Sequence, residues 1–322
     1  MINKKIWTLF SGIAITAMLL SGCGAQKPAE TQPPLKVTWN VFNGYSPFFI
    51  AQSKDLFQKH GLQVQAVRAS TGADEIIDLT GNSADCAMMV FSDAIPNIKN
   101  DSMKVVMVID STNGADQLIA SADIASVADL KGKRIGVAFG SYGELFVREL
   151  LKKSGIAANE VQFVNVAPEQ LLGTLGKTVD AGHTYDPYAS QARSQGYKEI
   201  ASTADLPPLI FDAVVCNSSV VKARPEDIRA FTAAWFEALT WWQANLQEGN
   251  SIVAKATDQK PEDISTDGIK LFTLADNQSA FDPNNQSSLF AAAKKTIDYY
   301  TSVGALTTPP DLNQLLDSSY LK

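Results

Sequence analysis

The chain has 322 residues, of which 45% are hydrophobic and 19% charged, and 27 Lys and Arg stand against 34 Asp and Glu for a formal charge of −7. These values are typical of a globular protein with one large domain or two medium ones, and they exclude a disordered, collagen-like or cysteine-stapled chain. The acidic balance argues against nucleic acid as a partner, because phosphate binding needs clustered Lys and Arg. With two His and three Cys, we expect no metal and no cofactor.

The first residues predict an export signal. Lysines at positions 4 and 5 precede an apolar stretch over residues 6–20 that is too short for a stable membrane-spanning helix. The tetrad Leu-Ser-Gly-Cys that ends at Cys23 resembles the bacterial lipobox, which implies cleavage before Cys23 and acylation of that residue. We therefore expect a lipoprotein signal peptide in residues 1–22, a flexible lipidated tether in residues 23–34, and a mature protein anchored to the bacterial membrane outside the cytoplasm.

Beyond the tether, short β-branched runs alternate with amphipathic stretches, which is typical of α/β layers around parallel strands. The first expected strands span residues 36–42, 62–68, 85–90 and 103–110. The helices expected between them span residues 47–60, 72–80 and 93–100. Ser46 before Pro47 is a typical helix start, and Gly61 is a typical helix stop.

A second α/β series follows the turn at Asn113 and Gly114. Its expected strands span residues 117–120, 134–138, 162–165, 178–183 and 199–201, and its expected helices span residues 142–154, 168–175 and 187–195. Residues 212–216 predict one more strand, and everything after Pro225 is predicted to be helical. In that last part, helical spacing predicts a buried stripe rather than a cofactor site for Phe231, Trp235, Leu239, Trp242 and Leu246.

Ligands of open α/β sheets bind beyond the carboxyl ends of the strands, where helix N-termini expose unpaired N–H groups. The turns at these positions are short, polar and partly aromatic. They supply the candidate ligand-binding residues Asn43, Tyr45, Ser70, Thr71, Gly72, Phe91, Ser92, Asp93, Ser141, Tyr142, Gly143, His183, Tyr185 and Asp186. Ser141 to Glu144 also fits the S-x-x-E capping box, so an ordinary helix cap explains this turn equally well.

Several of these turns lie in segments that resemble one family. The segments GYSPFFIA (44–51) with LFQKHGL (56–62), DLKGKRIGV (129–137) and VDAGHTYDPY (179–188) are similar to the extracytoplasmic solute-binding proteins of nitrate, sulfonate and taurine ABC transporters. The resemblance spans most of the mature chain.

It implies the type II periplasmic-binding-protein fold, an α/β fold with two lobes, each a mainly parallel sheet flanked by helices, and two crossover strands. Lobe 1 would comprise residues 35–111 and 212–322, and lobe 2 residues 112–211. The lobes would close on a small-molecule solute and deliver it to an ABC permease and its ATPase. We expect a monomer that is not an enzyme.

The candidate turns contain no Lys or Arg, so an anion would be held by hydroxyls and by the backbone N–H groups of Thr71, Gly72, Ser141, Tyr142 and Gly143. This pattern favours a sulfonate, nitrate or taurine-like solute over a carboxylate that needs a bidentate Arg. If the helix ends hold the solute, Gly143→Val should abolish binding and leave the fold intact.

Two aspartates among the candidates point to a different solute. If Asp93 or Asp186 faces the cleft, it would attract an amine or a ring N–H, so a nitrogen heterocycle or a vitamin precursor of the pyrimidine, thiamine or riboflavin type stays open. Both aspartates are equally explained as caps of the helices that follow them. His183 is either a ligand contact or a structural histidine.

Cys86 and Cys216 fall in strands that the resemblance makes neighbours. A disulfide would suit an oxidising compartment, but we expect two buried free thiols, because bridges between adjacent strands need special geometry. Two other functions stay open: a receptor that presents its solute to a sensor protein, and an enzyme of the pyrimidine-synthase type that shares this fold. That enzyme type carries a cysteine-rich metal motif, and the sequence has neither this motif nor a P-loop or dinucleotide fingerprint.

Overall fold

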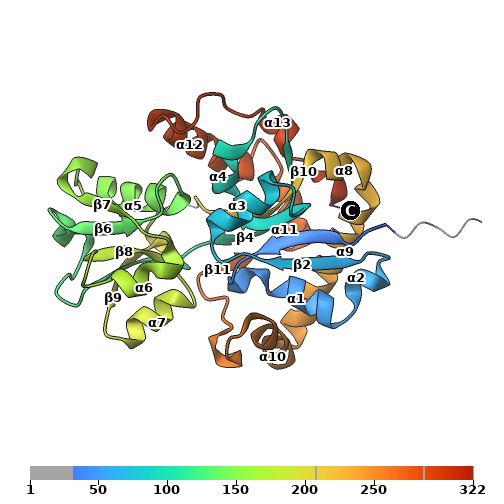
Figure 1. The fold of residues 1–322 in the computed structure, drawn as a ribbon, viewed down its shortest axis with the longest axis horizontal. Helices are drawn as coiled ribbons and strands as arrows, with labels where there is room; N and C mark the ends of the chain where they lie inside the picture. Colours follow the sequence, from blue (N-terminus) through green and yellow to red (C-terminus); the bar gives the residue numbers. More distant parts are fainter. Residues whose placement is uncertain (1–31, 207–208, 286, 322) are drawn as a thin grey trace, which may run out of the picture. The chain divides into compact units, whose positions relative to one another are not determined.

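The computed structural model describes residues 32–206, 209–285 and 287–321 (Figure 1). The expected signal peptide, the lipidated Cys23 and nearly all of the expected tether lie outside these residues. The fold is that of the compact unit Pro34–Lys322. Over the described ranges, no helix combines the length and the apolar character needed to cross a membrane.

A six-stranded sheet has the strand order β11-β4-β10-β3-β1-β2. Strand β1 runs parallel to β2 and β3, whereas β10 runs antiparallel to β3 and β4, and β11 antiparallel to β4. The strand predicted over 212–216 is thus confirmed, in the middle of this sheet. The strands are β1 (Leu35–Trp39), β2 (Val64–Arg68), β3 (Cys86–Val90), β4 (Met103–Thr112), β10 (Phe211–Asn217) and β11 (Ile269–Leu271).

A five-stranded sheet has the order β7-β6-β8-β5-β9 and is formed by the chain between β4 and β10. Its strands are β5 (Asp116–Ala120), β6 (Arg134–Val137), β7 (Gln162–Asn165), β8 (Ala181–Tyr185) and β9 (Lys198–Ser202). Strand β6 is parallel to β7 and β8, and β5 is antiparallel to β8 and β9. Two sheets with helices around each confirm the predicted fold class, while the exact lobe boundaries stay a prediction.

Each sheet is covered by its own helices (Figure 1). Around the five-stranded sheet these are α5 (Tyr142–Lys153), α6 (Leu171–Thr174) and α7 (Tyr188–Ser194). The others are α1 (Ser46–Ser53), α2 (Leu56–Lys59), α3 (Gly72–Thr80), α4 (Phe91–Ala94), α8 (Ser218–Ala223), α9 (Pro225–Ala244), α10 (Leu246–Thr257), α11 (Leu274–Ala280), α12 (Leu289–Ser302) and α13 (Leu312–Leu315).

The aromatic stripe of α9 is buried, as predicted, at Phe231, Trp235, Leu239 and Trp242, where α9 packs against α1 and α2. The prediction is wrong for Leu246, which begins α10 and is 59% exposed.

Several expected helices and strands differ from the observed ones. The helix expected over 47–60 divides into α1 and α2 because Asp55 adopts a left-handed φ of 54°. Ser46 does not cap α1, since its hydroxyl donates to the carbonyl of Asn43. The prediction that everything after Pro225 is helical is wrong, because Ile269–Leu271 forms β11. Three residues are too few for an alternation of apolar and polar side chains to predict a strand. This strand forms because it pairs with the edge of β4.

Cys86 and Cys216 form a disulfide, so the expectation of two free thiols is wrong. The antiparallel register of β3 and β10 places the two residues directly opposite each other, with their Cα atoms 3.9 Å apart. Side chains come close in such directly opposed pairs. The sequence did not reveal this register, which supplies the special geometry that the bridge requires.

Candidate ligand-binding cleft

A cavity of about 360 Å³ is lined by segments at the ends of strands from both sheets. This is the position at which open α/β sheets bind ligands. From the six-stranded sheet and its helices come Asn40, Phe42, Tyr45, Thr71, Gly72, Ala73, Glu75, Ile76, Ile77, Met89, Val90, Asp93, Pro96, Asn97 and Asp212. From the five-stranded sheet and its helices come Asp116, Ala138, Phe139, Gly140, Ser141, Tyr142, Ala167, Pro168, Glu169 and Tyr185.

Half of the sequence-predicted site residues lie in this lining: Tyr45, Thr71, Gly72, Asp93, Ser141, Tyr142 and Tyr185. The structure places the other seven elsewhere: Asn43, Ser70, Phe91, Ser92, Gly143, His183 and Asp186.

The side chains of five of these seven residues have local surroundings that explain why they lie outside the cavity. Asn43 is buried and donates through its amide to the carbonyl of Asp263, Ser70 is exposed, and Phe91 and Ser92 are buried in α4. The Asp186 carboxylate accepts from the backbone N–H of Ser190 in the first turn of α7.

Five carboxylates face the cavity, and sequence reasoning identified only Asp93 among them. The other four are Glu75, Asp116, Glu169 and Asp212, and none of the described residues that line the cavity is a Lys or Arg. A signal was present for some of these acids. Glu75 lies four residues before the buried Leu79 on the same face of α3, and Asp212 interrupts an otherwise apolar strand.

Burial without a compensating cation dominates the electrostatics of these acids. It raises the pKa of Asp93 to about 7 and that of Asp212 to about 7, and it raises the pKa of Glu75 well above its ordinary value. The Tyr45 hydroxyl donates to Asp212 Oδ1 over 2.6 Å, which opposes the rise at Asp212. Behind the lining, the fully buried Asp110 pairs across the strands with Asp212, and burial raises its pKa too.

Three buried acceptor atoms in the lining have no hydrogen-bond partner among the described residues: Asn40 Oδ1, Glu75 Oε1 and Glu169 Oε2. Two of them belong to a polar chain in which Asn40 Nδ2 donates to Tyr185 Oη over 3.1 Å, and this hydroxyl donates to Glu169 Oε1 over 2.7 Å. Buried acceptors in proteins are normally satisfied. These atoms therefore offer positions for N–H donors of a ligand.

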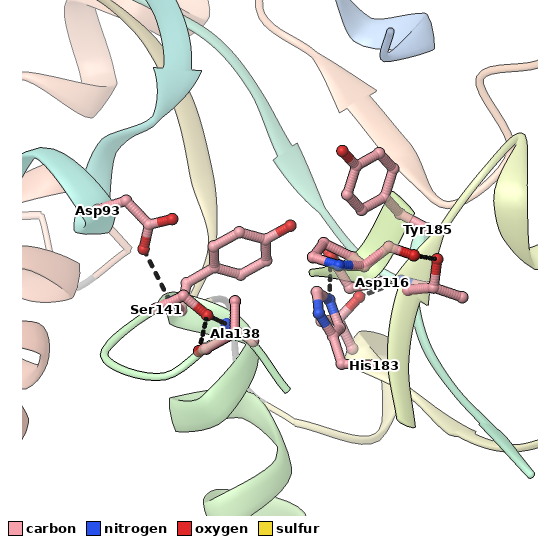
Figure 2. A network of polar contacts seen from close by, with 12 residues as sticks. Asp93, Asp116, Ala138, Ser141, His183 and Tyr185 are labelled. Atoms are coloured by element: carbon pink, nitrogen blue, oxygen red, sulfur yellow. Dashed lines mark hydrogen bonds and ion pairs between the residues drawn. The ribbon is translucent and has the colours of Figure 1, made fainter. Parts of the chain in front are cut away.

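The start of α5 contacts a carboxylate of α4, the helix that follows β3 of the six-stranded sheet. Asp93 Oδ1 accepts from the backbone N–H of Tyr142 over 2.8 Å and from the Tyr300 hydroxyl over 3.3 Å. Figure 2 shows Asp93 pointing at this turn, where the Ser141 hydroxyl donates to the carbonyl of Ala138. Asp93 thus caps α5 rather than its own helix.

The local caps of α5 were only partly predicted. Ser141 does cap the helix, because its hydroxyl oxygen accepts from the Gly143 N–H. The predicted reciprocal half of the capping box is wrong, since the Glu144 carboxylate accepts from the Gly140 N–H instead of that of Ser141.

His183 lies behind the cavity wall and supports Asp116. Its Nε2 is 2.8 Å from Asp116 Oδ1, and its side chain is 1% exposed (Figure 2). The ring packs edge-on against Tyr142, with centroids 5.1 Å apart. A Cβ atom at Gly143 would lie 2.3 Å from His183 Nδ1, so glycine is required for this close approach.

Aromatic rings and an apolar rim complete the cavity. Phe42 and Tyr185 meet edge to face with centroids 5.9 Å apart. Ile77 and Phe139 are 65% and 56% exposed at the rim. Flat rings within and apolar side chains at the rim suit a flat ligand with one apolar edge.

Residues 28–257 match the model of the NMT1-like family. The chain belongs to this family. A "Putative binding protein" of Brucella abortus (strain 2308) is 26% identical over 273 residues, which cover 83% of this chain and 85% of the relative. A "Putative ABC transporter periplasmic binding protein" of Brachyspira hyodysenteriae is 21% identical, over 76% of each chain. A "4-amino-5-hydroxymethyl-2-methylpyrimidine phosphate synthase" of Aspergillus parasiticus is 24% identical, over 69% of each chain.

Solved structures show the same fold as this NMT1-like protein. The alkanesulfonate-binding protein SsuA of Xanthomonas axonopodis pv. citri, bound to MOPS, superposes with a TM-score of 0.71 at 16% identity and covers 90% of this chain and 100% of its own. SsuA of Escherichia coli gives 0.71 at 18% identity, over 88% of this chain and 97% of its own. The predicted resemblance to extracytoplasmic solute-binding proteins is confirmed, and relatives and neighbours named as periplasmic imply an extracytoplasmic location.

Proposed function

We propose that this NMT1-like protein is the solute-binding component of an ABC importer, and that its solute is a small, flat nitrogen compound with N–H donors and a positive charge. Nitrogen heterocycles with an amino group and amidine-like compounds belong to this class. Of the two solute classes that the sequence left open, this proposal takes the nitrogen heterocycle over the sulfonate.

The observation that carries the proposal is the cluster of five carboxylates in a cavity whose described lining holds no Lys or Arg. Two like charges 4 Å apart repel by about 4 kcal/mol at an effective dielectric constant of 20, so an anionic solute would bind against a large penalty. A cation would instead relieve the cost of burying unpaired carboxylates. The unpartnered oxygens of Asn40, Glu75 and Glu169 would accept from its N–H groups.

The second part of the proposal is delivery to a permease. Because the cavity takes residues from both sheets, a bound solute would favour the arrangement in which both sides contact it, and this arrangement would be what a permease recognises. The name of the Brachyspira relative supports an ABC partner. Acylation of Cys23 would tether this monomeric protein beside the permease. Loss of uptake of the solute on deletion of the permease would distinguish transport from presentation to a sensor protein.

Binding without catalysis is also part of the proposal. The alternative is an enzyme, because the fungal relative is named as a synthase. In this chain, Cys86 and Cys216 are joined in a disulfide, which leaves neither as a thiolate for chemistry. Recovery of the bound solute unchanged after prolonged incubation, followed by mass spectrometry, tests this part.

The solute class can be tested with three probes that share one ring: benzamidinium, benzamide and benzenesulfonate. We expect benzamidinium to raise the melting temperature of the full chain, benzamide to raise it less, and benzenesulfonate to leave it unchanged. A larger shift with benzenesulfonate than with benzamidinium would overturn the proposed solute class.

Glu75→Gln localises the effect to the cavity. The substitution removes a carboxylate that can accept from the N–H groups of the probe and should weaken benzamidinium binding about tenfold in calorimetry. The matched control is Glu248→Gln, because Glu248 is 61% exposed and pairs with Lys54 on the surface. Equal affinities of the two variants would show that the probe binds outside this cavity.

A further inference from the structure

We propose that Asp93 determines the charge specificity of the cleft by occupying, with the protein's own carboxylate, the position in which the start of α5 would otherwise bind an anion. Sulfonates and similar anions are thereby excluded. The inference rests on the proposed function and deepens it, because it names the residue that sets the sign of the solute.

The start of a helix is intrinsically an anion site, since its first N–H groups lack partners within the helix and carry partial positive charge. Helix α5 has 12 residues, and its first turn lines the cavity through Ser141 and Tyr142. The location of this helix start in the cavity lining predicts that an anionic solute would bind there.

Four of the backbone N–H donors at this turn are already used by the protein. The N–H of Tyr142 donates to Asp93 Oδ1, that of Gly143 to Ser141 Oγ, that of Gly140 to Glu144 Oε2, and that of Ser141 to the carbonyl of Ala138. None of these four N–H groups therefore remains for a solute oxygen.

At α3, the other predicted anion-binding turn, one of the two predicted N–H donors is also taken. There the Thr71 N–H donates to the Asp74 carboxylate over 3.0 Å in a closed capping box. At both turns, one of the protein's own carboxylates thus accepts from a backbone N–H that an anion could otherwise use.

Asp93 differs from the other three acceptors of the α5 turn. Ser141, Glu144 and Ala138 belong to α5 or to the turn before it, whereas Asp93 reaches in from α4 beside the six-stranded sheet (Figure 2). Its removal would free the Tyr142 N–H without altering the sequence of α5. It would also remove the negative charge closest to that N–H.

The groups that face Asp93 define the charge that a solute meets. These are the Tyr142 N–H and the Tyr300 hydroxyl, which both donate to it, and the carboxylates of Asp116 and Glu169, whose charges raise its pKa. No cation is among these groups. A solute anion would displace Asp93 only by meeting two further carboxylates.

The test measures methanesulfonate binding to the full chain by calorimetry at pH 6 and pH 8. We expect no measurable binding to the wild type and at least about tenfold tighter binding to Asp93→Ala, whose freed helix start accepts the sulfonate. Asp93→Ala should bind methanesulfonate more tightly at pH 6 than at pH 8, because more of the remaining acids with raised pKa, Glu75 and Asp212, are neutral at pH 6. Asp186→Ala, which removes an aspartate outside the cavity, should show no gain.

Two further comparisons separate occupancy from general loss of charge. Asp93→Asn keeps an oxygen that accepts from the Tyr142 N–H, so it should gain nothing. In the Asp93→Ala background, Tyr142→Pro removes the freed N–H and should abolish the gain, whereas Tyr142→Ala keeps the N–H and should retain it. Proline is tolerated at this first helical position.

A folded Asp93→Ala that binds methanesulfonate no better than the wild type overturns the inference, as does an equal gain in Asp93→Asn. If Asp93→Ala does not fold, as judged by thermal unfolding, Asp93→Ser carries the same expectations and the same refutation. Gain of sulfonate binding by the variant, together with failure of benzamidinium to bind the wild type, would uphold the role of Asp93 and refute the proposed solute class.

Discussion

Replacing Asp93 by Asn should stabilise the ligand-free protein at pH 8 and leave its stability unchanged near pH 4. The half-buried Asp93 carboxylate has a pKa of about 7 in the folded protein and 3.8 in the unfolded chain. Near pH 4 and below, the folded protein holds this carboxyl neutral, as an amide is. As the pH rises from 4 to 7, the unfolded chain loses this proton first, so the wild type loses stability that the Asn variant keeps.

The expected size follows from the difference of about three pKa units. Each unit corresponds to about 1.4 kcal/mol, so the free energy of unfolding of Asp93→Asn should exceed that of the wild type by up to about 4 kcal/mol at pH 8. Solvent in the cleft screens this charge, which makes the value an upper bound. At about 2 °C per kcal/mol for a chain of this size, the melting temperature should rise by up to about 8 °C.

The assay is thermal unfolding of both proteins from pH 4 to pH 8. Asp186→Asn is the control, because the Asp186 carboxylate accepts from the Ser190 N–H and lies 3.6 Å from Arg193. That variant should not be stabilised at any pH. Parallel curves for the wild type and Asp93→Asn, or a lower melting temperature of Asp93→Asn at pH 8, would refute the reasoning.

Two predictions concern the frame of the cleft. Gly143→Val should destabilise the fold by about 1–3 kcal/mol and lower the melting temperature by several degrees, because the valine side chain would collide with His183. This prediction replaces the expectation from the sequence that the substitution would abolish binding and leave the fold intact. An unchanged melting temperature would support that earlier expectation instead. Replacing both Cys86 and Cys216 by Ala should lower the free energy of unfolding by about 3–5 kcal/mol, because the disulfide joins residues 130 positions apart. The measurement is urea unfolding under non-reducing conditions. An unchanged unfolding midpoint would show that the disulfide does not stabilise the fold.

Elements with local causes were predictable from the sequence. Helix α3 has the predicted bounds Gly72–Thr80, because Thr71 and Asp74 cap its start within one turn. Strand β7 also has its predicted bounds, Gln162–Asn165. Elements that depend on a distant partner were not predictable: β11 forms only where β4 presents an edge, and the Cys86–Cys216 bridge depends on a register between strands far apart in the chain.

The same distinction holds for the cleft. Tyr45, Tyr142 and Tyr185 were found because aromatic residues near strand ends and turns are visible in the sequence. The sequence analysis did not identify Glu75 and Glu169 as site residues, because an acidic residue within or beside a short helix is expected to face solvent unless its neighbours in the fold are known. Their hydrogen-bond partners include Asn40 for Glu75 and Tyr185 for Glu169, which come from other segments of the chain.

The position of β10 in the middle of the six-stranded sheet also constrains biogenesis. Strand β10 lies between β3 and β4, yet it is synthesised only after the whole five-stranded sheet. Until it inserts, β3 and β4 each leave an edge unpaired, and such edges invite association with other chains. The strand that closes these edges also carries Asp212 into the cavity wall, so the wall of the cavity is complete only once β10 has inserted between β3 and β4.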